Sequence, residues 1–440
     1  MKRIFGEFAY GDGPRAGCWW DETIAAPNWP RLADTQTADV AIIGGGFTGI
    51  SAALHLAQAG VDVAVLEANT PGWGASGRNG GFCCLGGSKL SHGAMTRTFG
   101  EQATAEYEAG ESAAVDLVHS LLSSHAIEAD THSRGETQLA HTPRAMRHLR
   151  QEAESMEREG IDPQLVEQAD LRRNGLHGSF FGALTRPEGF ALNPRKYLFG
   201  LADAATRHGA RLFQNSAVTA LDRRDRGFVL RTAQGEIRAN QVIIATNGYS
   251  SEDLPPWLAG RYMPAQSTVM VTRPMSEAEL EAQGWTTAQM AYDTRNMLHY
   301  FRLMPDRRFL FGMRGGLLAS PGVEQRIRLK LRRDFDAMFP DWAQVETTHM
   351  WSGMVCLSRN LVPFVGPVPE QPGLFAGLCY HGNGVAMGTY SGRLLAGLIL
   401  GQPGELPYSP VMQKMRKFPL GPMRRALMPP AYAVLAALDL

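Results

Sequence analysis

Two largely apolar runs near the start of the chain are separated by a stretch with helical periodicity. Residues 39–43 and 61–66 have the nearly uninterrupted apolar character of strands buried in a parallel sheet. Between them, Leu54 and Ala57 lie on the inward face of a predicted helix. A strand, a helix and a second strand in this order predict a βαβ unit, and therefore an α/β fold.

The same periodicities predict further elements along the chain. In the stretch 321–341, the side chains on one face of a helix are Ile327, Leu331, Phe335 and Met338. Charged outer faces accompany the other helical stretches, whereas the strand segments are short and largely apolar. The other helices are expected at 100–124 and 142–160, and the later strands at 241–250, 261–274, 297–314 and 373–379.

Composition limits the kind of protein. A chain of 440 residues is too long for one compact core, so two domains are expected. The 43 basic and 43 acidic residues cancel, which argues against nucleic acid as the main partner. The five cysteines form no C-x-x-C pair and the histidines form no metal-binding motif, so we expect a metal-free cytoplasmic protein with reduced thiols. No stretch approaches the ~20 apolar residues that span a bilayer.

The first glycine loop has the spacing of a dinucleotide-binding turn. Gly44, Gly46 and Gly49 follow the first strand as G-x-G-x-x-G. They allow, in turn, a tight turn, a close approach of backbone to a pyrophosphate, and close packing of helix on strand. The helix N-terminus faces the phosphates, and Glu67, at the end of the second strand, can accept hydrogen bonds from a ribose. The complete order favours a Rossmann unit over a chance glycine turn.

Three later stretches bear on the ligand. The segment "GWGASGRNGG" at 72–81 can bring backbone into contact with a flat, polar ligand. The segment "QVIIATNGYS" runs from a strand into Asn247–Gly248, at the kind of strand end where open α/β sheets bind ligands. The segment "YHGNGVAMG" at 380–388 leads from a strand into a helical run.

The loop at 380–388 has two interpretations. A second nucleotide-binding unit would need a following strand and an acidic ribose partner, but the chain continues with the proline-rich "GQPGELPYSP". The other interpretation is a helix N-terminus that returns to the first cofactor. Amides around Gly382–Val385 would then stabilise negative charge on a reduced flavin ring. We therefore predict one FAD, held from both ends of the chain.

Five motifs in order point to a family. With "AIIGGGFTGISAALHLAQAG", "GASGRNGG", "IIATNGY", "WSGMVCLSRNLVPFVGP" and "GLCYHGNGVAMGTYSG", the chain resembles the D-amino-acid oxidase-like FAD-dependent oxidoreductases. It looks most similar to the branch of gamma-glutamylputrescine oxidase and the sarcosine and glycine oxidases. The resemblance implies a Rossmann-type FAD-binding domain beside a mixed-sheet (α+β) substrate domain. It also implies that an amine or amino acid C–N bond is oxidised to an imine by hydride transfer to FAD.

The resemblance also divides the chain, and the FAD-binding domain is expected to be discontinuous. An aromatic arm with Trp19, Trp20 and Trp29 is expected to pack on the body. The expected segments are an N-terminal arm at 1–37, an FAD-binding domain at 38–90, 191–254 and 346–405, a substrate domain at 91–190 and 255–345, and a C-terminal extension at 406–440.

We expect the FAD to be bound without a covalent bond. The flavin-linking cysteine of monomeric sarcosine oxidases corresponds to a position near Gly353, whereas the nearest cysteine is Cys356. The predicted FAD-binding residues are Gly44, Gly46, Phe47, Thr48, Gly49, Glu67, Ala68, Gly74, Ser76, Gly77, Arg78, Asn79, Gly80, Gly81, Val218, Ala245, Asn247, Gly248, Gly382, Asn383, Gly384 and Val385.

Tyr300 and Arg302 are the first candidates for substrate binding, because strand alternation places both on one face with Leu298. The alternative is that this face is core, with Arg302 paired to a surface acid. Tyr380 and His381 precede the closing loop and should lie near the flavin. A structural hydrogen bond is the competing interpretation for His381.

The electron acceptor is open between oxygen and a quinone. The lysine that assists oxygen in sarcosine oxidases is absent, since its position falls near Leu310. Lys89 is the lysine near a flavin motif, with Arg78 and Arg314 as other cations, but the favoured interpretation of Lys89 is a solvated residue leaving the site. Slow reaction with oxygen would then be expected. The basic, then apolar, segment 415–440 would be available to contact a membrane quinone pool or a partner surface.

Three functions remain open at this point. Ala386 and Val355 stand where relatives carry a carboxylate-binding lysine and arginine, so a substrate carboxylate, if there is one, is expected far from the reacting carbon. The first function is an amine oxidase or dehydrogenase similar to gamma-glutamylputrescine oxidase. The second is an imino-acid or amino-acid dehydrogenase that passes electrons to quinone. The third is a non-catalytic FAD-binding partner protein.

Overall fold

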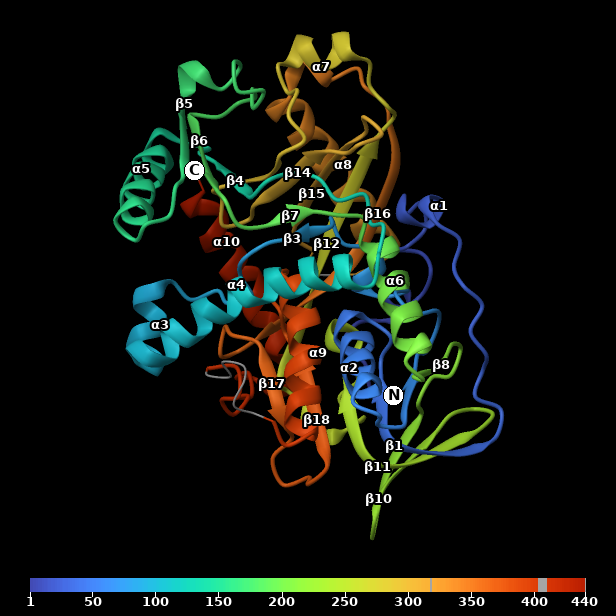
Figure 1. The fold of residues 1–440 in the computed structure, drawn as a ribbon. Coiled ribbons are helices and arrows are strands. Elements are labelled where there is room, and N and C mark those ends of the chain that lie inside the picture. Colours follow the sequence, from blue (N-terminus) through green and yellow to red (C-terminus); the bar gives the residue numbers. More distant parts are fainter. Residues whose placement is uncertain (317–318, 403–409, 440) are drawn as a thin grey trace.

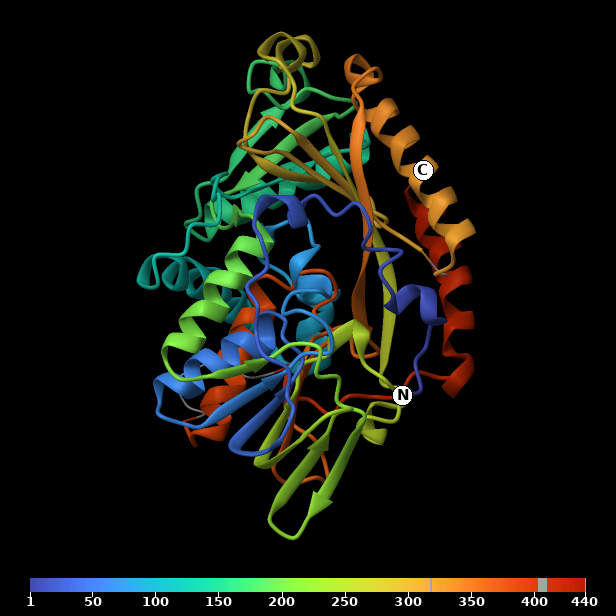
Figure 2. The same ribbon diagram turned by 90° about the vertical axis from the view of Figure 1, so that its right-hand side faces the viewer.

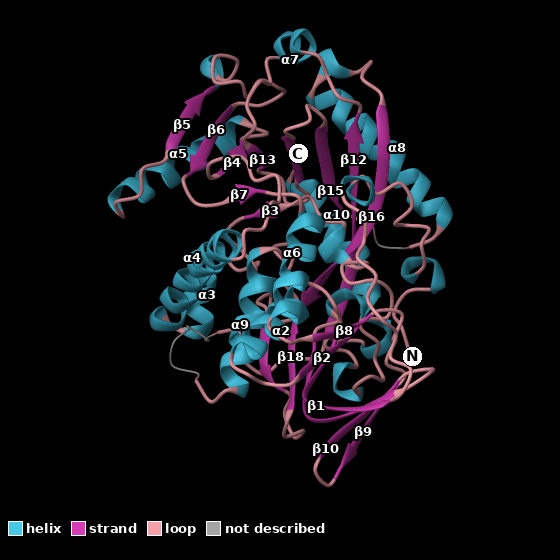
Figure 3. Ribbon diagram, turned by 45° about the vertical axis from the view of Figure 1, so that its right-hand side comes forward, coloured by secondary structure: helices cyan, strands magenta, loops and turns pink. Residues whose placement is uncertain are grey.

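The computed structural model describes residues 1–316, 319–402 and 410–439. Two eight-stranded sheets form most of the molecule, and Figure 3 shows them in its lower and upper halves. Between the two sheets lies a short pair of strands, β3 (Phe82–Cys83) and β7 (Phe190–Ala191) (Figure 1). An α/β fold with a second, mixed-sheet unit was predicted, and the structure confirms it.

The first sheet is built around the strand that precedes the first glycine loop. The central strand β1 (Thr35–Ile43) pairs in parallel with both β11 (Glu236–Ile244) and β2 (Val63–Leu66). Its apolar end is fully covered, which explains the near-continuous apolar run. The strand order is β17 (Phe364–Pro367), β18 (Leu374–Leu378), β11, β1, β2 and β8 (Arg211–Phe213), with β10 (Gly227–Arg231) and β9 (Ala220–Arg224) extending from β11.

Helices from distant parts of the chain cover one face of the first sheet (Figure 1). The helix α2 (Phe47–Gln58) packs between α6 (Pro194–Arg207) and α9 (Ala386–Ile399). The long helix α4 (Glu101–Ser124), which follows α3 (His92–Phe99), packs against α9 and joins the same apolar core. Residues 91–190 were assigned to the substrate domain, but α4 buries its apolar side on the first sheet's helices.

The second sheet is mixed. All its neighbouring strands are antiparallel except β13 and β4, which are parallel. Its order is β16 (Thr347–Ser358), β12 (Tyr262–Thr272), β15 (Phe309–Arg314), β14 (His299–Leu303), β13 (Met290–Asp293), β4 (Glu136–Leu139), β6 (Gly182–Arg186) and β5 (Gln164–Glu167).

One face of the second sheet is covered by α8 (Pro321–Met338) (Figure 2). As the sequence pattern predicted, Leu331, Phe335 and Met338 are buried against the sheet, whereas Ile327 is only half-buried. The opposite face looks towards the first sheet. Further helices are α1 (Trp20–Thr23), α5 (Pro143–Arg158) beside β5 and β6, and α7 (Glu277–Gln283).

The strand β16 corrects the expected boundary between the two units. Residues 346–405 were all assigned to the FAD-binding domain, but β16 pairs with β12 along the second sheet. Its far end nevertheless joins the first unit, because Cys356 packs in the core beneath the first sheet. A strand of 12 residues is long enough to belong to both units.

The C-terminal segment returns to the second sheet. The helix α10 (Met428–Leu438) packs through Met428 on β12. The carboxylate of Asp439 accepts hydrogen bonds from the backbone N–H groups of Asn296, at 2.7 Å, and Met297, at 3.0 Å. Figure 2 shows α8 and α10 along the same edge of the molecule. Within the described ranges, no helix is long and apolar enough to cross a membrane.

Candidate active site

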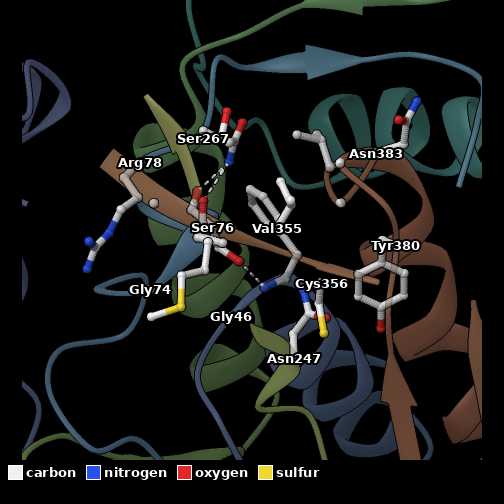
Figure 4. Close-up of a pocket in the computed structure, with 18 of the residues that line it drawn as sticks. Gly46, Gly74, Ser76, Arg78, Asn247, Ser267, Val355, Cys356, Tyr380 and Asn383 are labelled. Atoms are coloured by element: carbon white, nitrogen blue, oxygen red, sulfur yellow. Dashed lines mark hydrogen bonds between the residues drawn. The ribbon is translucent and has the colours of Figure 1, made fainter. Parts of the chain in front are cut away.

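A large cavity lies between the two sheets, and both sheets contribute to its wall. From the first sheet come the ends of β1 and β11 and the glycine loop after β1. From the second sheet come Ser267 on β12 and Tyr300 on β14. Figure 4 shows Gly46 and Ser76 on one side of this cavity and Tyr380 and Asn383 on the other. The cavity therefore opens where the carboxyl ends of parallel strands meet, as expected for a ligand site.

The first glycine loop is packed too tightly for any side chain. Gly44 has φ +111°, and a Cβ there would lie 2.6 Å from the carbonyl oxygen of Ala245. A Cβ on Gly49 would lie 2.0 Å from the carbonyl oxygen of Gly44. The hydroxyl of Ser76 accepts a hydrogen bond from the N–H of Phe47 at 3.0 Å, which joins the second glycine-rich segment to the start of α2. The glycines of this turn therefore contribute only backbone to the wall.

Glu67 is held at the end of β2 by two backbone N–H groups. Its carboxylate accepts hydrogen bonds from Gly45 at 2.8 Å and from Asn69 at 2.9 Å. Burial nevertheless raises the pKa of this carboxyl, because the loss of water outweighs the stabilisation from these donors. Two donors leave acceptor capacity on the carboxylate, which lines the cavity and is available to a ribose hydroxyl.

The segment 72–81 is anchored from its outer side. Trp351 donates a hydrogen bond to the carbonyl oxygen of Arg78 at 2.7 Å, and Trp20 donates to that of Asn79 at 2.8 Å. Arg302 donates to the next carbonyl oxygen, that of Gly80, at 3.0 Å. Three consecutive carbonyl groups are thus satisfied by side chains outside the cavity, which fixes the loop without using cavity-facing groups.

Residues 380–385, the closing loop, are tied directly to the first glycine loop. The hydroxyl groups of Thr48 and Tyr380 lie 2.8 Å apart. The N–H of Cys379 donates to the side-chain oxygen of Asn247 at 2.9 Å. The closing loop leads into the N-terminus of α9, so the two glycine motifs, more than three hundred residues apart, line one cavity. This is the arrangement expected if one ligand is held from both ends of the chain.

The two ring nitrogens of His381 are both occupied by backbone groups. Its Nδ1 donates to the carbonyl oxygen of Gly87 at 2.7 Å, and its Nε2 accepts from the N–H of Ser358 at 3.1 Å. Burial lowers the pKa of His381 to about 4, so the ring is neutral at pH 7. His381 lines the cavity, but its hydrogen bonds match the structural interpretation.

Tyr300 and Arg302 share a face of β14, as strand alternation predicted, but only Tyr300 lines the cavity. The Tyr300 hydroxyl lies 3.0 Å from the hydroxyl of Ser267, and both groups face the cavity. Arg302 is 1% exposed. Besides Gly80, its guanidinium donates to the carbonyl oxygen of Leu192 at 2.8 Å and to Nε2 of His132 at 2.8 Å. These partners place Arg302 behind the wall rather than in it.

Two cations lie where the closing loop meets the second sheet. Lys89 lines the cavity. Its side chain keeps solvent-accessible surface, yet protein surrounds its ammonium group on most sides. This loss of solvent, and then the charge of Arg314, lower the pKa of Lys89 to about 7. Arg314, at the end of β15, also lines the cavity. A Cβ on Gly382 would lie 2.7 Å from its guanidinium, so only glycine lets the two approach.

The structure brings most of the predicted site residues to this cavity. The catalytic candidates on its wall are Lys89, Tyr300, Tyr380 and His381. The predicted FAD-binding residues on its wall are Gly44, Gly46, Phe47, Thr48, Glu67, Ala68, Gly74, Ser76, Arg78, Asn79, Gly80, Ala245, Asn247, Gly382, Asn383, Gly384 and Val385. The predicted residues that do not line the wall are Gly49, Gly77, Gly81, Val218, Gly248 and Arg302.

Sequence reasoning missed several residues that shape the site. Ser267 and Tyr292 face the cavity from strands whose pairing the sequence did not reveal. Trp20 and Trp351 hold the loop 72–81, and neither shows a motif that would have identified this role. Within the described ranges, no group of three or more His, Cys, Asp or Glu side chains is placed to hold a metal ion.

Comparison with known proteins gives one consistent result. The sequence model of the family described as FAD dependent oxidoreductase matches residues 39–398. The chain is 32% identical over 393 residues to "Probable oxidoreductase OrdL" of Rhizobium meliloti (strain 1021), covering 88% of this chain and 89% of that protein. It is 32% identical over 382 residues to "Gamma-glutamylputrescine oxidoreductase" of Escherichia coli (strain K12), covering 84% and 85%. The crystal structure of glycine oxidase from Geobacillus kaustophilus superimposes with a TM-score of 0.69 at 23% identity, covering 87% of this chain and 99% of that one.

Proposed function

Since the chain belongs to the FAD dependent oxidoreductase family, we propose that it oxidises a C–N bond of an amine or amino acid to an imine. FAD supplies the chemistry when bound, because its ring accepts a hydride from the carbon next to nitrogen. The substrate proposed first is a primary amine similar to that named for the Escherichia coli relative.

The cavity wall fits this cofactor. The turn at Gly44 and Gly46 leaves room only for backbone, next to the N-terminus of α2, which suits a pyrophosphate. Glu67 lies at the end of β2, where a ribose is expected. At the far end, the N-terminus of α9 presents positive partial charge from the closing loop. The residues that would hold the flavin ring are those of the closing loop and of the segment 72–81.

The chain's own residues bind, orient and exclude water. Tyr300 and Ser267 offer hydroxyl groups on the substrate side of the cavity. Leu298 and Val269 add apolar wall beside them. Such surroundings disfavour an ammonium ion, so they favour the neutral amine that a hydride donor must be. A neutral His381 with both nitrogens occupied is not available as a base, so its role is to fix the closing loop.

The observation that carries this proposal is that the two glycine motifs line one cavity, which the second sheet also lines. Anaerobic addition of polyamines, acylated diamines, N-methyl amino acids and cyclic imino acids to the purified holoenzyme tests it. We expect one of the primary amines to bleach the flavin absorbance near 450 nm. If only cyclic imino acids do so, the imino-acid dehydrogenase is the better description. A flavin that no compound bleaches would support the non-catalytic alternative.

The cofactor link is a separate part of the proposal. Cys356 lines the cavity, but its sulfur lies 3.5 Å from that of Cys379, in the buried core beneath the first sheet. This placement supports non-covalent binding. Acid precipitation is therefore expected to release all the flavin into the supernatant. Flavin that stays with the precipitate would indicate a covalent bond, and peptide mapping would then locate it.

A further inference from the structure

The guanidinium of Arg314 has no protein partner that neutralises it. Within the described ranges, it forms no ion pair with an acidic side chain and its guanidinium nitrogens form no hydrogen bond. The groups with the strongest electrostatic effect on it are the phenols and thiol of Tyr300, Cys84, Tyr432 and Tyr292. All four are neutral at pH 7. A charged group in a cavity wall is costly without a counter-charge, so the missing partner is expected in the ligand.

The rest of the substrate side does not cancel this charge. The acidic residues on the cavity wall are Glu67 and Glu136 within the described ranges. Glu67 lies at the other end and is bound by backbone N–H groups. Burial raises the pKa of Glu136 to about 8, so this carboxyl is largely protonated at pH 7. Lys89, on the same part of the wall, adds positive potential, and His381 beside it is neutral.

The position of Arg314 is fixed by its surroundings. It is the last residue of β15, where it pairs with Ser267 of β12, and its N–H donates to the carbonyl oxygen of Leu298 at 3.3 Å. Its guanidinium lies against Gly382, which has φ +110° and no side chain. Arg302, on the adjacent strand β14, is an informative comparison, because each nitrogen of its guanidinium has a protein acceptor. Arg314 has the same charge and keeps its donors for a ligand.

We infer that Arg314 binds a carboxylate of the substrate, and that the enzyme therefore acts on amines that carry a carboxylate group. This inference rests on the proposed function and specifies its substrate class. A planar guanidinium can donate two parallel hydrogen bonds to a carboxylate, which a single ammonium cannot do. Arg314 comes from the second sheet. It thus supplies a carboxylate anchor. Val355 and Ala386, which stand where relatives carry such an anchor, cannot supply one.

Two pairs of probes separate this inference from the proposed function. The reactive pair is gamma-glutamylputrescine, which carries a carboxylate, and N-acetylputrescine, which has the same amine end and none. The unreactive pair is gamma-glutamylbutylamine and N-butylacetamide, which lack the terminal amine. Flavin reduction is measured with the first pair, and perturbation of the flavin spectrum, with calorimetry, measures binding of the second. The proteins are the wild-type holoenzyme and the variants Arg314→Met, Arg314→Lys and Arg307→Met.

For Arg314→Met, binding of both carboxylate-bearing probes is expected to weaken about 10- to 100-fold, the usual range for a charge-assisted hydrogen bond. Binding of the two probes without a carboxylate should change by less than about threefold, and Arg314→Lys should lie between wild type and Arg314→Met. Arg307, on the surface with an exposed side chain, serves as a control whose loss changes neither pair.

Three outcomes decide the inference. Equal weakening by Arg314→Met of the binding of probes with and without a carboxylate would overturn it and leave Arg314 as a wall residue. Loss of FAD from Arg314→Met would also overturn it, because the cofactor would then be the partner of the guanidinium. If gamma-glutamylbutylamine binds in an Arg314-dependent way while neither gamma-glutamylputrescine nor N-acetylputrescine bleaches the flavin, the inference stands and the proposed amine oxidation fails.

Discussion

On the side of the first sheet, the cavity wall consists largely of backbone: glycines at 44, 46 and 80 and the amides at two helix N-termini. On the side of the second sheet it consists of side chains, among them Ser267, Tyr300 and Arg314. A wall of backbone fits any dinucleotide of the right shape, whereas a wall of side chains selects by charge and size. The difference separates cofactor binding from substrate choice, and each can be changed without the other.

The largest effect is expected from breaking the backbone wall. In Gly49→Val, a Cβ would lie 2.0 Å from the carbonyl oxygen of Gly44, so the turn cannot keep its shape. We expect no FAD-loaded protein, as measured by the ratio of absorbance at 450 nm to that at 280 nm. Gly322→Val is the matched control, because nothing lies within 4 Å of a Cβ there. Normal FAD content in Gly49→Val would refute the role given to this turn.

The next largest effect is a difference in stability between variants of two arginines of the second sheet, Arg302 and Arg314. Arg302→Met leaves the carbonyl groups of Gly80 and Leu192 without donors, and should lower the free energy of unfolding by about 3 kcal/mol. Arg314→Met breaks no hydrogen bond within the described part of the chain and should change it by less than about 1 kcal/mol. Thermal release of flavin, followed by fluorescence, measures both. A stable Arg302→Met with slow flavin reduction would instead return Arg302 to substrate binding.

A smaller effect is expected at Glu67, whose carboxylate the wall holds with two backbone donors. Glu67→Gln keeps the shape but weakens acceptance of hydrogen bonds from a ribose. FAD affinity should fall about tenfold, the equivalent of one hydrogen bond to a charged group. Equilibrium dialysis of the purified protein measures this, with substrate specificity unchanged in the remaining holoenzyme. Unchanged FAD affinity would show that the ribose is bound by other residues.

The smallest effect concerns the electron acceptor and Lys89. The pKa of Lys89 is lowered to about 7, so its positive charge is present below this pH and is lost as the pH rises through it. Because a cation near the flavin favours electron transfer to oxygen, reoxidation by oxygen should slow several-fold between about pH 6 and pH 8. The neighbouring Arg314 stays charged, and Cys84 and His381 stay neutral over this range.

Rapid mixing of substrate-reduced enzyme with oxygen, at each pH, measures this dependence. Lys89→Met is expected to remove it. Slow reoxidation in both proteins at every pH would favour a quinone as acceptor. The exposed apolar side chains of Met423, Val434 and Leu438 at the C-terminal segment would then be the surface to test for membrane contact.

The same contrast explains what the sequence could predict. Glycine spacing is a local pattern with one geometric cause, so Gly44, Gly46 and the closing loop were identified as one site. The role of Arg302 could not be read in this way, since strand alternation gives the face but not the acceptors behind it. Those acceptors, at Gly80 and Leu192, come from segments more than one hundred residues away. The domain limits at α4 and β16 were missed for a similar reason, because long elements contact both units.

The discontinuous first sheet also sets the order in which this protein can become functional during its synthesis. Ile43, at the end of β1, pairs with Ile244 of β11, which is synthesised about two hundred residues later. The closing loop ends only at Val385 of the 440 residues. A partly made chain therefore has β1 beside β2 but without β11, and long-range pairings of this kind form slowly. The cavity is complete only when nearly the whole chain has left the ribosome. We therefore expect FAD to bind to the finished chain rather than to the nascent one.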